Sequence, residues 1–161
     1  MKQDCRRRGR GVIIVAVGLL AVGLAAGCGD GWESRGNGFV SGRELVTQGR
    51  YADALPLLQG YLRDHPSGKH ASRAHFFIAK AYIGLGNPAA ARAAFQETIR
   101  QHAESLEAHK SRYKLGMIDF WEGDRAAARK RFAGLADRPD GPLAPEAGAM
   151  RDFLDGASLK E

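Results

Sequence analysis

The chain has 161 residues, 44% hydrophobic and 26% charged, which is the composition of a folded globular protein rather than a disordered one. Its net charge of +6 at pH 7 would suit a nucleic-acid partner. However, residues 1–27 carry five basic residues against one acidic residue, and residues 28–161 carry 19 against 17. Because nucleic-acid binding needs clustered positive charge on the folded part, this distribution argues against such a partner.

Residues 1–27 have the layout of a secretory signal peptide. A basic segment precedes an uncharged apolar run at 12–24, and the small residues 25–27 follow directly before Cys28. The run is shorter than the roughly 18–20 residues needed to span a bilayer. The stretch Leu24-Ala25-Ala26-Gly27-Cys28 resembles the lipobox of bacterial lipoproteins, and this resemblance implies acyl chains such as palmitate on Cys28. The alternative is a plain membrane anchor ending in a free cysteine.

Residues 28–37 are rich in glycine and are predicted to be a lipidated flexible tether. Lipid on Cys28 would place the protein in the cell envelope, anchored to a membrane outside the cytoplasm. In some bacterial lipoproteins an aspartate directly after the cysteine goes with retention in the inner membrane. Here Gly29 holds that place and Asp30 comes one place later, so we expect an anchor in the outer membrane, facing the periplasm. The alternative location is the outer leaflet of the inner membrane.

A repeat of 37 residues runs through the remainder of the chain. Three glycines have this spacing, an alanine follows each glycine by five residues, and a leucine or phenylalanine follows it by nine. The repeat positions are Gly49, Gly86, Gly123, Ala54, Ala91, Ala128, Leu58, Phe95 and Phe132. Each glycine can end one helix in a left-handed conformation, and the next helix then packs closely through its alanine. The spacing therefore predicts three helical hairpins.

The predicted fold is all-α, with a hairpin solenoid and a C-terminal capping helix at 38–161. The expected helices span 38–48, 52–64, 70–85, 88–101, 107–122, 125–136 and 144–155, without strands. Asn87 and Asp124 are expected N-caps. Pro56 should make its helix start late or kink, and Asp119, in place of an aromatic residue, suggests a rotated or loosely packed third hairpin.

This pattern resembles the tetratricopeptide repeat, which usually has 34 residues. The longer spacing looks most like two envelope families: the lipoprotein of the outer-membrane β-barrel assembly machine and the periplasmic Tol–Pal-associated coordinator of cell division. The first family is longer, with about five repeats. The resemblance implies shared architecture, and a shared role does not follow from it.

The sequence contains no recognisable catalytic, metal or cofactor site. His65, His70 and His75 are five residues apart, whereas two zinc ligands on one helix face need a spacing of three or four. His65 and His102 share one repeat position, where a capping role is expected. No Gly-x-Ser-x-Gly elbow is present. We therefore expect no enzyme, no bound metal, no cofactor and no small-molecule substrate.

A binding groove is the strongest functional expectation. In solenoids of this kind the first helices of the hairpins line an inner surface that holds extended peptides. Transfer of the family's groove positions selects Arg43, Arg73, Phe76, Lys80, Ile83, Lys110, Tyr113, Lys114, Met117 and Trp121. This basic and aromatic set would suit an acidic or C-terminal segment of a partner protein. The alternative is that the aromatic residues and Met117 are core.

These features favour an envelope scaffold that binds other envelope proteins within an outer-membrane or periplasmic assembly complex. The alternative is a pilotin-like accessory lipoprotein for secretion, pilus or polysaccharide export. Both functions use the lipid on Cys28 as the contact with the membrane.

Overall fold

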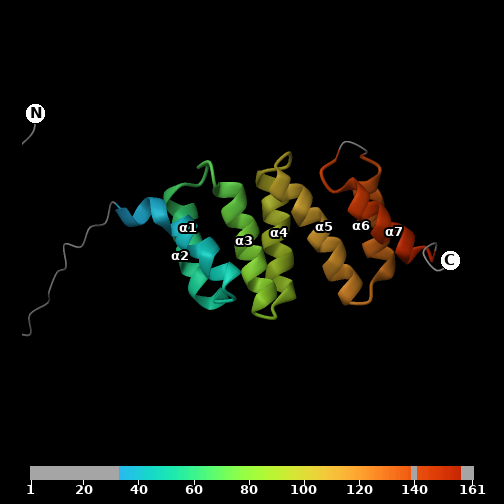
Figure 1. The fold of residues 1–161 in the computed structure, drawn as a ribbon, viewed down its shortest axis with the longest axis horizontal. Coiled ribbons are helices and arrows are strands. Elements are labelled where there is room, and N and C mark those ends of the chain that lie inside the picture. Colours follow the sequence, from blue (N-terminus) through green and yellow to red (C-terminus); the bar gives the residue numbers. More distant parts are fainter. Residues whose placement is uncertain (1–32, 139–140, 157–161) are drawn as a thin grey trace, which may run out of the picture.

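The computed structural model describes residues 33–138 and 141–156, and the signal segment and Cys28 lie outside this part. Within these residues seven helices follow one another along one axis, with α1 and α7 at opposite ends (Figure 1). Their bounds are α1 Glu33–Thr47, α2 Tyr51–Asp64, α3 Ala71–Gly84, α4 Pro88–Gln101, α5 Leu106–Trp121, α6 Arg125–Ala136 and α7 Ala144–Leu154. The described residues contain no strand. The predicted all-α class is confirmed.

The helices form three hairpins, α1–α2, α3–α4 and α5–α6, and α7 packs against α6. Each helix also packs on the next one along the chain, so the hairpins stack into a helical-repeat solenoid. The first helices of the hairpins contact one another, α1 with α3 and α3 with α5. They therefore form a continuous face, which we call the A-face. None of the described helices is long and apolar enough to cross a membrane.

The same turn ends the first helix of every hairpin. Gly49, Gly86 and Gly123 have φ values of 78°, 69° and 86°, in the left-handed region that glycine reaches without steric cost. In the second turn the amide of Gly86 donates to the carbonyl of Ile83, and the amide of Asn87 donates to that of Tyr82. This pair of bonds is a Schellman motif, which satisfies carbonyls that the helix end would leave unpaired.

The N-caps follow directly after these turns. The side-chain oxygen of Asn87 accepts from the amide of Ala90 at 3.0 Å, and that of Asp124 accepts from the amide of Ala127 at 2.9 Å. Both predicted caps are confirmed. The cap removes one unpaired amide from each helix start, and it lets α4 and α6 begin directly after the glycine turn.

The hairpins share one packing unit. The alanine and large apolar residue of each second helix are fully buried: Ala54, Ala91, Ala128, Leu58, Phe95 and Phe132. In the first and third hairpins, the large residue faces a glycine on the first helix, α1 or α5. A Cβ atom built on Gly42 would lie 2.7 Å from Leu58, and one on Gly116 would lie 2.9 Å from the ring of Phe132. Ala79 is the corresponding residue of α3, at the same spacing of 37 residues. These small residues allow close helix approach.

Three expectations need correction. Helix α1 begins at Glu33 rather than at residue 38, in spite of the low helix propensity of its glycines, and its residue Gly38 lies close to Leu57 and Tyr61 of α2. Part of the predicted tether is therefore helical. Helix α2 begins at Tyr51 and continues through Pro56, which lies inside the helix on an exposed side, so the proline removes one helical hydrogen bond without delaying the start of the helix.

The third correction concerns Asp119, which is only 3% exposed. Its carboxylate accepts hydrogen bonds from Arg92 of α4 and Arg131 of α6, each at 2.5 Å. Arg92 also contacts Glu122 at 2.5 Å. Asp119 thus connects three helices by ion pairs instead of an aromatic contact, and the third hairpin is not loosened here.

Candidate protein-binding groove

Two neighbouring clefts open on the A-face, and we refer to them together as the A-face groove. The larger cleft has a volume of about 430 Å³ and lies among α1, α3 and α5, with Tyr51 and Phe95 from the second helices. The smaller cleft, of about 210 Å³, lies at the other end of the same helices. The larger cleft is lined by Val46, Thr47, Tyr51, Lys80, Ile83, Gly84, Phe95, Lys114, Ile118 and Trp121. The smaller cleft is lined by Arg43, Arg73, Phe76, Phe77, Leu106, Glu107 and Lys110.

Three lysines from two helices concentrate positive charge in this groove. Burial lowers the pKa of Lys80, and the charges of Lys114 and Lys110 lower it further. The ammonium group of Lys80 also lies 5.4 Å from the ring centroid of Phe77, which is within cation–π range. The lysines are therefore close enough for their charges to act on one another, and a bound anion would relieve this repulsion.

One acidic residue lines the smaller cleft. Glu107 is buried, and its carboxylate lies 3.4 Å from Arg73 and accepts a hydrogen bond from Ser72, also at 3.4 Å. This pairing offsets the charge of Arg73 and fixes its side chain across the junction of α3 and α5. The cationic part of the groove consequently lies at Arg43 of α1, Lys80 of α3, and Lys110 and Lys114 of α5.

The structure separates the predicted groove residues into two groups. Arg43, Arg73, Lys80, Ile83, Lys110, Lys114 and Trp121 line the clefts. Phe76 borders the smaller cleft but is 9% exposed and packs against Phe95, with ring centroids 5.7 Å apart. Tyr113 packs against Phe132 at 5.2 Å, and Met117 packs against the same cluster. Tyr113 and Met117 are partly buried and pack against the core cluster of α6 and α7, and neither lines the two clefts.

The repeat explains this outcome. Phe39, Phe76 and Tyr113 are separated by 37 residues, so they occupy one structural position. Phe39 is buried as well and lies 5.6 Å from the ring of Tyr61. Each first helix thus contributes one aromatic residue to its own hairpin core, and a comparison of all three copies would have found this signal in the sequence.

Apolar surface borders the lysines. Trp121 is 62% exposed, although tryptophan is usually well buried. It lines both the larger cleft and a smaller depression with Ile83, Pro88 and Ile118. Leu106 is also exposed, at the entrance of the smaller cleft. Exposed aromatic residues beside cations are frequent anchors in protein interfaces.

The histidines do not form a site with one another. His65 and His102 are the C-caps of α2 and α4, as predicted. The rings of His75 and His102 lie 5.6 Å apart. Within the described ranges, no three His, Cys, Asp or Glu side chains lie close enough together to hold a metal ion.

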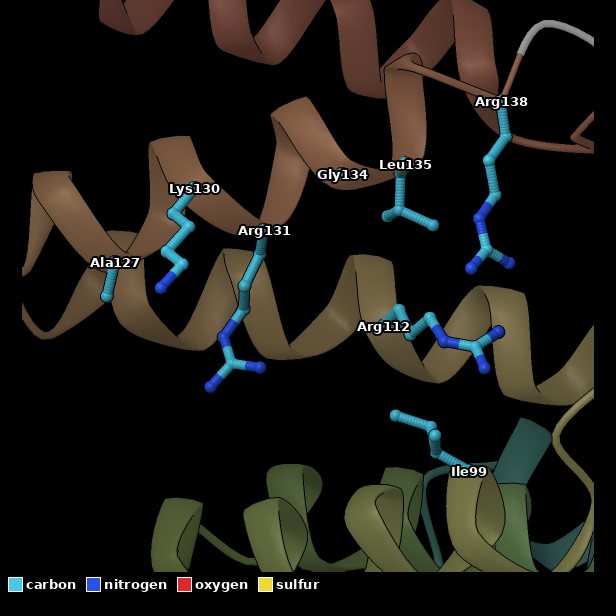
Figure 2. Close-up of a pocket in the computed structure, with 8 residues that line it drawn as sticks. All are labelled: Ile99, Arg112, Ala127, Lys130, Arg131, Gly134, Leu135 and Arg138. Carbon is cyan, nitrogen blue, oxygen red and sulfur yellow. The ribbon is translucent and has the colours of Figure 1, made fainter.

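A second basic region was missed by the sequence analysis. A cavity of about 520 Å³ lies among α4, α5 and α6 and is lined by Ile99, Arg112, Ala127, Lys130, Arg131, Gly134, Leu135 and Arg138 (Figure 2). These residues belong to different repeat positions, so the repeat gave no signal for them.

Stacked helical hairpins with a lined inner face define a class of repeat proteins that bind other proteins. Within this class, the tetratricopeptide repeat family matches the chain at residues 39–105 and again at 76–118. Residues 39–118 are therefore similar to the tetratricopeptide repeat family, whose members are generally non-catalytic interaction modules. A comparison with curated proteins gives no match.

Proposed function

We propose that this protein is a lipid-anchored scaffold of the bacterial cell envelope that binds an acidic segment of a partner protein in the A-face groove. The observation that carries the proposal is the grouping of Lys80, Lys110 and Lys114 in one groove beside the exposed Trp121. The cations would attract the acidic segment, and the apolar surface would supply contact area on desolvation. Export and anchoring are supported by the apolar run and the following small residues and cysteine at positions 12–28.

The geometry favours an extended segment over a compact ligand. The two clefts adjoin along three helices, and the cations come from α1, α3 and α5. An extended chain can contact successive repeats, and this is the usual use of a solenoid face. A scaffold role within an outer-membrane or periplasmic complex fits such a groove on an anchored protein.

Photo-crosslinking in intact envelopes tests the groove directly. A photoreactive amino acid at Trp121 should form an adduct with one acidic segment, identified by mass spectrometry of the linked peptide. The same probe at Gln96, on the exposed side of α4, is the matched control and should not form this adduct. Equal labelling from both positions, or a linked segment without acidic residues, would contradict the proposal.

The anchor has its own test. The mature protein should begin at Cys28, and its intact mass should exceed the peptide mass by that of its acyl chains. Cys28→Ser should remain uncleaved or leave the membrane fraction, because one or more acyl chains supply the membrane affinity. A mature mass without lipid would remove the anchoring part of the proposal and leave the groove untouched.

A further inference from the structure

The cavity among α4, α5 and α6 combines basic walls with an apolar floor. Arg112, Lys130, Arg131 and Arg138 supply the cations, whereas Ile99, Ala127 and Leu135 supply apolar surface. Among the residues that the structure describes, those that line this cavity include no acidic one. Figure 2 shows the side chains of Arg112 and Arg138 together at one end, with Leu135 and Ile99 beside them. Its volume of about 520 Å³ is in the range of small-molecule sites.

Arg112 is the central residue of this end. Its Nη2 donates to the carbonyl oxygen of Ala103 at 3.1 Å, which holds the side chain in place. Its Nη1 is buried and has no hydrogen-bond partner among the described residues. The bond to Ala103 keeps the guanidinium group at the wall of the cavity, where its positive charge acts on the enclosed space.

The charge around Arg112 is not balanced by its neighbours. Burial lowers its pKa, the positive charge of Arg138 lowers it further, and Glu104 acts in the opposite direction. Arg131 differs, because its Nε donates to Asp119. The cations that remain for a ligand are thus Arg112 and Arg138, with Lys130 at the other end of the cavity.

We propose that this cavity binds a phosphate ester whose phosphate group lies between Arg112 and Arg138 and whose organic part contacts Ile99 and Leu135. A phosphate monoester carries close to two negative charges at neutral pH and can therefore balance both guanidinium groups, whereas a single carboxylate carries one charge. The apolar floor favours an ester over inorganic phosphate. The ester could be a soluble nucleotide or a lipid headgroup, since both present the same group.

Gly134 provides a variant that closes the cavity without removing a charge. A Cβ atom at Gly134 would have nothing within 4 Å, so a larger side chain would extend into open space. Gly134→Leu should block part of the cavity. It should also preserve or raise the melting temperature, because leucine has a higher helix propensity than glycine.

Isothermal titration calorimetry of the purified full chain tests the proposal with two probes. AMP represents a soluble ester, and dihexanoyl phosphatidic acid below its micelle concentration represents a headgroup. Adenosine and dihexanoyl phosphatidylcholine are their controls. We expect at least one phosphate monoester to bind, and Gly134→Leu and Arg112→Gln/Arg138→Gln to weaken it at least tenfold. Arg63→Gln/Arg125→Gln, which removes the same charge from exposed positions, should change it less than twofold.

The outcomes separate the two sources. Binding of AMP alone would assign a soluble ester, and binding of phosphatidic acid alone would assign a headgroup; both results support the site. Lys130→Gln/Arg138→Gln gives a second charge variant that keeps the Arg112 bond to Ala103. Absence of binding by both probes, or equal weakening by the cavity variants and the exposed control, would overturn the proposal.

Discussion

At residue scale, each hairpin depends on one large side chain packed beside small ones. Phe95 is fully buried among Phe76, Ala79, Leu115 and Ile118, and it therefore joins the second hairpin to the first helix of the third. The equivalent residues are Leu58 and Phe132. Each of them is likewise fully buried in the core cluster of its own hairpin. These residues were predictable because they recur at a fixed spacing.

Phe95→Ala should lower the free energy of unfolding by about 3–5 kcal/mol, the usual cost of removing a buried aromatic ring and leaving a cavity. Chemical denaturation followed by circular dichroism measures this change. Gln96→Ala, one residue further on the exposed side of α4, is the control and should change it by less than about 0.5 kcal/mol. A loss for Phe95→Ala similar to that of the control would mean that the repeat register is wrong.

His75 should make stability fall in mild acid. Burial lowers its pKa below the usual 6.5, and the charge of His102 lowers it further, against a smaller raising effect of Glu97. The folded state therefore binds a proton less readily than the unfolded state, so stability is lost as the pH falls below about 6.5. His75→Gln should reduce the drop in melting temperature between pH 7.5 and pH 5. An unchanged drop would contradict this assignment.

At element scale, the sequence predicted six of the seven helices to within a residue or two, because glycine turns, caps and the 37-residue spacing mark their ends. The start of α1 was not predictable, since its glycines favour a tether by their low helix propensity. Asp119 was misread for a related reason. Its partners Arg92 and Arg131 belong to other helices, and no local pattern in the sequence indicates such long-range ion pairs.

The Asp119 ion pairs should hold the second and third hairpins together. Asp119→Ala leaves two arginines without this partner, and we expect a loss on the order of 2–3 kcal/mol, below the value for a fully buried pair because both arginines are partly exposed. Thermal and urea denaturation measure it. Asp53→Ala breaks the exposed pair with Arg50 and should cost less than about 1 kcal/mol. Equal effects would show that the Asp119 contacts contribute no more than a surface pair.

At the scale of the whole molecule, stacking brings residues from three helices into one groove. Arg43, Lys80 and Lys114 are far apart in the sequence, and the family's groove positions were sufficient to select them. Those positions did not distinguish Tyr113 and Met117, which turn toward α6 and α7. The cavity of Arg112 and Arg138 was not predictable either, because it forms between hairpins and its residues follow no repeat.

The central claim is that the A-face groove binds an acidic segment through its lysines. The most direct measurement is fluorescence anisotropy with the crosslinked segment as a synthetic peptide. It compares the affinity of this peptide for the parent, for the groove variant Lys110→Glu/Lys114→Glu and for the control Arg63→Glu/Arg125→Glu. We predict at least tenfold weaker binding by the groove variant, less than a twofold change in the control, unchanged helical circular dichroism in both, and weaker parent binding at higher salt. Equal affinities for parent, groove variant and control would contradict the claim.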